Sequence, residues 1–336
     1  PLPPCAMVLE TAPEEAKPSG KLYVKWIDAP YWKRIDLASS EELIAGANPK
    51  VVSPNGQWGA YIKEGPVFLV VKSLKGDGVE YQISLEEQAK TFEGAQKRIL
   101  WVNDTMLQVQ FFERDGANTR DRFILASLLN GETETVELHE PEMYTDERGS
   151  ILAVSPDLRR LAYIASGGTG DTFQLVLWDR ETQRQLIVIR QSTPYPMLKW
   201  SPDGQNLAYL RRTITGEEIV VINSDGKELN AIKMVGGVGA ITWSPDGEKL
   251  AFVHFNEREQ YQLAVWEIGT GTIFSPCIFI QETPILAWSL DNRYLAVSGM
   301  TDQGIQSKKY QTFIWDLEQN WVVNQFYGQI SQLDWR

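Results

Sequence analysis

Two nearly identical stretches decide the fold: WSPDGQNLAYL at Trp200–Leu210 and WSPDGEKLAFV at Trp243–Val253. Five more divergent copies can be aligned with them, and neighbouring copies are 43 to 53 residues apart. A repeat of this length that is built from strands is typical of propeller blades rather than of helical solenoids. The seven copies begin at Val52, Trp101, Val154, Trp200, Trp243, Trp288 and Trp335.

Each copy predicts one four-stranded antiparallel blade. An apolar strand ends at the Trp or Val, and Ser-Pro-Asp-Gly then favours a tight turn, because Pro presets φ and Gly accepts a positive φ. LAYL or LAFV forms the second strand, and an outer strand such as Arg184–Arg190 ends the blade. The one segment with a competing helical pattern is Ser84–Phe92. Third strands are expected at Gln174–Asp179, Glu218–Asn223, Gln262–Glu267 and Thr312–Asp316.

The two ends of the chain are predicted to share a blade. Residues 330–336 supply one innermost strand, and residues 21–46 contain three strand-like runs. Joining them removes the unpaired sheet edges that a partial blade would expose. We therefore predict an all-β chain in which residues 21–336 form a single seven-bladed β-propeller, closed by this N- and C-terminal composite blade. Residues 1–20, with five prolines, are expected to form an extended arm.

The W-S-P-D-G-x-x-L-A-F run resembles the TolB-type propeller repeats, strongly from residue 151 onward and weakly before. Third strands that end in Trp178-Asp179 and Trp315-Asp316 also look like WD-repeat strands, but the Gly-His pair of true WD repeats is missing. The resemblance implies a propeller fold. Because TolB-like propellers are most familiar from bacterial envelope proteins, it also implies an extracytoplasmic or periplasmic location, with the cytoplasm as the alternative.

Composition excludes several classes. The chain has 336 residues, 43% of them hydrophobic, and a net charge of −12. This supports a sizeable core and argues against a nucleic-acid partner, which needs a basic surface. Two histidines, His139 and His254, nearly exclude His-based metal sites, so no metal and no cofactor is expected. Two cysteines, Cys5 and Cys277, are too few for a disulfide framework.

No apolar stretch is long enough to span a bilayer, which leaves peripheral membrane association as the expected mode of any membrane contact. The sequence begins at Pro1, which we interpret as a processed or trimmed start. Cys5 is interpreted as a free thiol, with a lipid-anchor site as the alternative.

Propellers bind through the loops that join the second and third strands and through the loops between blades. We expect the partner-binding face there. Its aromatic anchors would be Tyr31 and Trp32, with packing onto the loop base as the alternative. The candidate residues of this face are Tyr31, Trp32, Tyr195, Met197, Arg211, Arg212, His254, Asn256 and Met300.

Three other features favour a structural interpretation. Most of the twelve tryptophans repeat at two fixed positions of the copies, which indicates packing between blades rather than an aromatic cage. Asp203, Asp246 and Asp291 recur in the turns and are expected to form them. The acidic run 132–147, which includes His139, is predicted to be a solvated edge, with calcium or a basic partner as the alternative.

Catalytic patterns are sparse. There is no GxSxG motif for a serine nucleophile, and SGGTGD at Ser166–Asp171 leads into a strand rather than a helix, which argues against a phosphate site. We therefore expect a non-catalytic interaction module or scaffold, a subunit that docks to a larger, membrane-associated bacterial assembly. The alternative is a small-ligand or metal-dependent enzyme of carbohydrate or lactone type at the channel mouth. A regulatory propeller of a separate catalytic chain is a third option.

Overall fold

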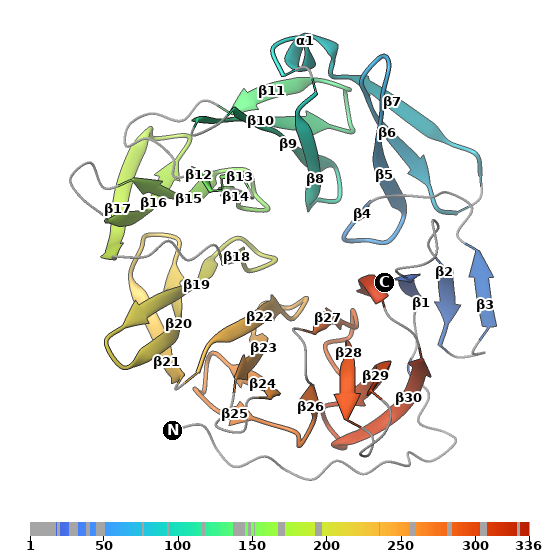
Figure 1. Ribbon diagram of the computed structural model, residues 1–336, viewed down its shortest axis with the longest axis vertical. Coiled ribbons are helices and arrows are strands. Elements are labelled where there is room, and N and C mark those ends of the chain that lie inside the picture. The colour runs from blue at the N-terminus through green and yellow to red at the C-terminus, as the bar shows by residue number, and fades with distance from the viewer. Residues whose placement is uncertain are drawn as a thin grey trace. The chain divides into compact units, whose positions relative to one another are not determined.

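The computed structural model divides the chain into two compact units, one of residues 46–198 and one of residues 1–45 with 199–336. Both consist almost wholly of antiparallel strands (Figure 1). The structure describes residues 18, 21–26, 33–37, 41–44, 51–75, 77–92, 94–115, 118–136, 145–146, 149–150, 152–166, 172–191, 197–234, 236–255, 260–280, 284–302, 308–327 and 330–335.

The unit of residues 46–198 contains three four-stranded antiparallel sheets. A strand pair, β12 (Thr145–Asp146) with β13 (Gly149–Ser150), and the single-turn helix α1 (Glu86–Ala89) accompany them. The longer helix that the pattern at Ser84–Phe92 allowed is therefore reduced to one turn. The sheets are β4 (Val51–Val52), β5 (Trp58–Lys63), β6 (Phe68–Ser73) and β7 (Glu80–Ser84); β8 (Gln96–Asn103), β9 (Met106–Asp115), β10 (Asn118–Ser127) and β11 (Thr133–Val136); and β14 (Leu152–Val154), β15 (Arg160–Ser166), β16 (Phe173–Asp179) and β17 (Arg184–Gln191).

The second unit contains three further four-stranded sheets and one five-stranded sheet. One of the four-stranded sheets joins strands from both chain ends in the order β3-β2-β1-β31. The sheets are β18 (Leu198–Trp200, which begins at the unit boundary), β19 (Asn206–Thr213), β20 (Gly216–Asn223) and β21 (Glu228–Met234); β22 (Val238–Trp243), β23 (Lys249–Phe255), β24 (Tyr261–Glu267), β25 (Ile273–Phe274) and β26 (Phe279–Ile280); β27 (Ile285–Trp288), β28 (Tyr294–Asp302), β29 (Lys308–Asp316) and β30 (Trp321–Tyr327); and β1 (Lys21–Trp26), β2 (Lys33–Asp36), β3 (Glu41–Ile44) and β31 (Ile330–Trp335).

The sheet shared by the two chain ends has the composition predicted from the sequence. β1 pairs antiparallel with β31, with Leu22 opposite Trp335 and Val24 opposite Leu333. Figure 1 shows the C-terminal strand beside β1. Leu22 and Val24 are fully buried, and Trp335 stacks on Tyr294 of β28 with ring centroids 6.0 Å apart. This sheet is thus paired at its innermost edge and packed on the neighbouring sheet.

The Ser-Pro-Asp-Gly turns share one hydrogen-bond scheme. At the turn after β22, the buried Ser244 hydroxyl donates to Asp246 Oδ1 at 2.5 Å and accepts from the Lys249 N–H at 2.9 Å. Asp246 Oδ1 also accepts from the Glu248 N–H, and Gly247 takes a φ of +73°. The same serine-to-carboxylate or serine-to-amide bond recurs in the turns that begin at Ser53, Ser155, Ser201 and Ser289.

Repeated tryptophans form hydrogen bonds between neighbouring sheets. Trp243 is 7% exposed, and its indole N–H donates across to the Lys199 carbonyl at 2.8 Å. Trp288 repeats the contact one sheet further along, to the Thr242 carbonyl at 3.2 Å. Trp266 and Trp315, at the other repeated position, are fully buried. The tryptophans therefore belong to the packing between sheets, as predicted.

One expectation about the sheets is wrong. The sheet β22–β26 has a fifth strand, because Phe279–Ile280 turns back to pair with β24 beyond the short β25. Cys277, two residues before that strand, forms a disulfide. The free-thiol interpretation was made for Cys5, which lies outside the described residues, so it stays a prediction.

Candidate binding face

Each sheet has two distinct ends. We call the end that carries the Ser-x-Asp turns the turn end, and the opposite end, where the second and third strands are joined, the loop end. In the sheet β18–β21, Arg211 and Arg212 lie at the loop end of β19, and in the next sheet His254 lies at the loop end of β23. The structure therefore places these three predicted residues at the same end of two successive sheets in one unit.

Only two of the remaining predicted residues lie in the described part of the structure. Met300 lies half-buried near the loop end of β28, and Met197 lies half-buried just before β18. Four others lie outside the described residues, and their assignment stays a prediction: Tyr31, Trp32, Tyr195 and Asn256.

Arg211 is held in a network of carboxylates. Its Nε donates to Glu218 Oε2 at 2.7 Å, and its Nη1 donates to Glu228 Oε2 at 2.7 Å. Glu218 is 5% exposed, so the guanidinium neutralises a buried charge. Burial opposes the charged form of Arg211, but the hydrogen bonds to Glu228 and Glu218 outweigh it and raise its pKa. Arg211 is therefore a structural cation that fixes the hairpin.

The neighbouring Glu217 fixes the connection to the next sheet. Its side chain is 8% exposed, and Oε2 accepts the backbone N–H of Val238, at the start of β22, at 2.9 Å. The chain passes very close here, because a Cβ on Gly236 would lie 2.1 Å from the Phe255 carbonyl oxygen. The Phe255 N–H in turn donates to the Gly237 carbonyl at 2.7 Å. This role of Glu217 could not be predicted from the sequence, since the contact depends on the fold of the next repeat.

Between these two anchors, the β19–β20 hairpin ends in Ile214-Thr215. Thr213 pairs with Gly216, and the Thr213 hydroxyl donates to the Gly216 carbonyl at 3.0 Å. Ile214 has a relative exposure of 106%, the highest of the exposed large hydrophobic residues. A rigid hairpin thus presents a branched aliphatic side chain entirely to solvent at the predicted face. Ile214 follows the predicted residues Arg211 and Arg212 but was not itself among the predicted face residues.

His254 is a buried, neutral imidazole. It is 7% exposed, and burial lowers its pKa, although a backbone hydrogen bond at Phe255 acts in the opposite direction. Its Nε2 has no hydrogen-bond partner among the described residues. The ring lies 6.2 Å from that of Phe252, centroid to centroid. His254 therefore lies beneath the face rather than on it.

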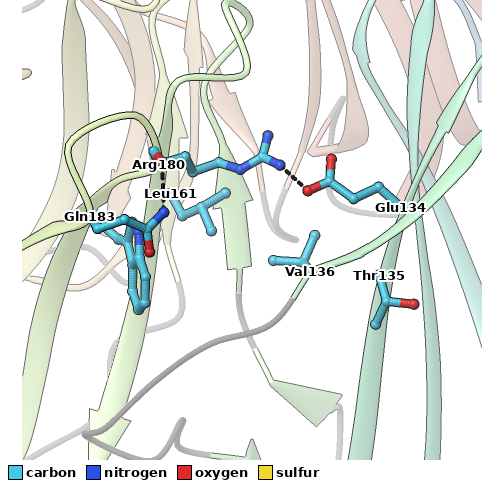
Figure 2. A pocket seen from close by; sticks show the side chains of 7 residues that line it. Glu134, Thr135, Val136, Leu161, Arg180 and Gln183 are labelled. Carbon is cyan, nitrogen blue, oxygen red and sulfur yellow. Dashed lines mark hydrogen bonds and ion pairs between the residues drawn. The ribbon is translucent and has the colours of Figure 1, made fainter.

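A pocket of about 310 Å³ lies at the turn end of the other unit, between the sheets of β11 and β16 (Figure 2). Leu161 and Trp178 are buried at its base. Arg180 and Glu134 form an ion pair across it, and Arg180 Nη1 also donates to the Leu158 carbonyl at 2.9 Å. Both charges are thus satisfied by protein groups, and the pocket joins two sheets rather than presenting a free charge to a ligand.

Metal and membrane features were also sought in the part of the chain that the structure describes. It contains no group of three or more His, Cys, Asp or Glu side chains placed to hold a metal ion. Most of the acidic run 132–147, including His139, lies outside the described residues, so the calcium alternative stays untested. No helix among the described residues is long and apolar enough to cross a bilayer.

The fold was compared with known protein families and solved structures. No family model matches the chain, and no curated protein is significantly similar to it. TolB from Acinetobacter baumannii is similar over 91% of this chain and 78% of its own, with a TM-score of 0.50 and 14% identity. The fold is a TolB-like β-propeller. Oligogalacturonate lyase from Vibrio parahaemolyticus has a TM-score of 0.56 at 11% identity, over 92% of this chain and 86% of its own.

A protein from Bacteroides uniformis described as a 6-phosphogluconolactonase is similar over 94% of this chain and 99% of its own, with a TM-score of 0.54 and 12% identity. Identities this low show the fold alone, and TolB-like propellers carry unrelated functions. The function must therefore be argued from the residues of this chain.

Proposed function

We propose that the chain is a non-catalytic docking module that binds a protein partner through the loop end around Ile214. The observation that carries this proposal is the full exposure of Ile214 at the tip of a hairpin fixed by two buried glutamates and Arg211. A preorganised apolar tip loses little conformational entropy on binding and gains from burial in a partner. Arg212, exposed beside it, supplies a polar rim.

The charges at this face serve the fold rather than catalysis. Arg211 and Glu218 neutralise each other, and Glu217 accepts a backbone N–H. A general acid would need a carboxyl group with a raised pKa. Among the described residues, the carboxyl groups with a shifted pKa are Asp77, Glu80 and Asp179. The pKa of each is lowered by hydrogen bonds that favour the ionised form, at Asp179 against the opposing effect of burial.

The enzyme alternative draws on the lyase and the lactonase among the similar structures. Activity toward an oligogalacturonate or a sugar lactone that survives Ile214→Asp would favour it. Loss of a protein complex in the same variant would favour docking.

For the whole molecule, we propose seven blades, closed by the sheet that joins β1 with β31. Six four-stranded sheets and one five-stranded sheet match the seven sequence copies in number. Deleting residues 330–336 should free the edge of β1 and cause aggregation. A truncated chain that stays monomeric and melts at the native temperature would contradict closure.

We also propose an extracytoplasmic location, as part of a larger, membrane-associated assembly. The support is Cys277, because disulfides persist in oxidising compartments and are rare in the cytosol. The protein is isolated from its source in acid, which stops thiol–disulfide exchange, and without an alkylating agent that would block thiols. Thiol titration of the denatured protein should then find no free thiol. Two titratable thiols would contradict this location.

The docking proposal is tested by photo-cross-linking at two matched positions. A benzophenone amino acid replaces Ile214 in one variant and Leu290 in the other. Leu290 is also exposed (53%) and lies in the same unit, but at the turn end. We expect one stoichiometric partner cross-linked at 214, absent at 290 and lost when Arg212→Glu is added. Equal labelling at both positions, or none, would overturn the proposal.

A further inference from the structure

The outer strand β17 differs from the other outer strands of the described sheets. It is the last strand in the order β14-β15-β16-β17, so its far edge pairs with no strand of the described chain. At eight residues it is also the longest outer strand, and its centre, Leu186 to Ile189, is wholly apolar. Leu186 and Ile187 are 43% and 39% exposed. Long apolar edges of this kind are templates for another strand.

Three of the other sheets have protected outer edges, whereas the seven-residue outer strand β30 carries no charged residue. β21 carries Glu228 and Lys233 in a shorter strand, β11 has only four residues, and the outer edge of the five-stranded sheet is split into the two-residue strands β25 and β26. Short strands and edge charges are the usual means of preventing edge pairing. β17 is longer than these strands, and its charges, Arg184 and Arg190, lie only at its ends. A bulge at Val188 leaves Arg184 to Ile187 as a regular stretch.

The two ends of β17 are positively charged. Arg184 and Arg190 are exposed, and the side chain of neither forms a hydrogen bond or an ion pair with any other residue that the structure describes. This contrasts with Arg159, Arg180, Arg211 and Arg293, which all pair with carboxylates. On a chain with a net charge of −12, two uncompensated arginines that bracket an apolar strand are an unusual arrangement.

We propose that the free edge of β17 binds an extended segment of a partner protein by strand addition, and that this segment is apolar at its centre and acidic at both ends. The partner's backbone would hydrogen-bond to β17, and its terminal carboxylates would lie near Arg184 and Arg190. A second copy of this chain fits less well. When β17 pairs antiparallel with itself over all eight residues, Arg184 lies opposite Gln191 of the copy and one position from its Arg190. The arginines of the two copies then come close together at both ends of the pair, and like charges on neighbouring strands repel each other.

This surface is separate from the proposed docking at Ile214, and its test needs no cross-linked partner. The probes are three peptides of about seven residues, which matches the span of the strand. The first is acetyl-DVTVTVD-amide, the second carries Lys in place of both Asp residues, and the third is the acidic peptide with alternate backbone nitrogens methylated. Binding to the full chain is measured by fluorescence anisotropy at low and at physiological salt.

We expect the acidic peptide to bind at least about tenfold more tightly than the lysine peptide at low salt, with a smaller ratio at physiological salt because screening weakens the ion pairs. The methylated peptide should not bind, since it cannot donate the ladder hydrogen bonds. In the double variant Arg184→Glu with Arg190→Glu, the lysine peptide should become the tighter ligand. The control variant Lys75→Glu with Lys227→Glu makes the same charge change at exposed turns and should keep the original preference.

Three results would overturn the proposal. They are the absence of saturable binding by either unmethylated peptide, equal affinity for both of them, and binding of the methylated peptide. A dimer in sedimentation velocity that is strengthened by Arg184→Glu would also overturn it, because the occupant of the edge would then be a second copy. Each of these outcomes leaves the cross-linking result at Ile214 unaffected.

Discussion

The two ends of the same sheets are built in opposite ways. At the turn end, five turns repeat one hydrogen-bond scheme, in which a buried serine bonds to an Asp or Asn two residues later. At the loop end, no such scheme recurs among the residues that the structure describes. Glu217 bonds to a backbone amide of the next sheet, His254 keeps an unpaired nitrogen, and Ile214 is fully exposed.

This difference shows which end stabilises the molecule and which end is available for recognition. Groups at the turn end are satisfied within the protein, so changing them should mainly lower stability. The carboxyl of Asp179 illustrates this. Burial opposes its ionisation, but the Thr182 N–H and Arg159 outweigh that effect and lower its pKa to about 2. Exposed residues at the loop end should instead be replaceable without loss of stability.

The largest expected effect is at the turn end. Trp243→Ala should lower the free energy of unfolding by roughly 3–5 kcal/mol, because it removes a buried ring and the N–H bond to Lys199. Urea denaturation followed by circular dichroism would measure it. Trp101→Ala is the matched control. Trp101 is only half-buried, and its indole N–H has no hydrogen-bond partner among the described residues, so this substitution should lower the unfolding free energy by less. A loss below about 1 kcal/mol for Trp243→Ala would contradict packing between the sheets.

Ser244→Ala should cost about 1–3 kcal/mol, because it leaves the Lys249 N–H without its acceptor in a buried turn. Ser224, in the turn after β20, is partly exposed, and its hydroxyl makes no hydrogen bond with the described residues. Ser224→Ala should therefore change the unfolding free energy by less than about 0.5 kcal/mol. Equal effects of the two substitutions would mean that the repeated serine bond does not stabilise the turn.

His254 should make stability depend on pH. Its pKa is lowered in the folded chain, so the unfolded chain takes up a proton at a higher pH than the folded one. The contribution of a neutral His254 is complete above the unfolded value of about 6.5 and is lost as the pH falls below it. Urea midpoints at several pH values should therefore decrease on acidification through this range. His254→Asn should flatten that slope, and an unchanged slope in this variant would refute the assignment to His254.

The smallest expected effect on stability is at the tip of the hairpin. Ile214→Ser should shift the unfolding free energy by less than about 0.5 kcal/mol, since the side chain has no buried contacts to lose. Differential scanning calorimetry at matched protein concentration would measure this. A loss above about 1 kcal/mol would indicate that Ile214 is part of the core, and the contrast between the two ends would then fail.

The same contrast explains what could be predicted from the sequence. The turns and tryptophans of the turn end recur in register, so repeated letters such as WSPDG located them, and the pairing of β1 with β31 followed from an incomplete first and last copy. The loop end has no repeated letters. The role of Glu217 depends on an amide in the next sheet, and β26 consists of two residues without periodicity.

The disulfide of Cys277 was missed for a related reason. Its only candidate partner in the chain is 272 positions away, and two cysteines at such a separation carry no spacing signal. The exposed tip at Ile214 could have been noticed, because an aliphatic residue in a two-residue hairpin has few neighbours to pack against.

The sheet shared by β1 and β31 has a consequence for biosynthesis. The strand Lys21–Trp26 leaves the ribosome early, but its neighbour Ile330–Trp335 is made about 300 residues later. At roughly 5–20 residues per second, the first strand waits about 15–60 s for its partner. During that interval the nascent chain holds an unpaired β edge, so it cannot complete this sheet until Ile330–Trp335 has been made.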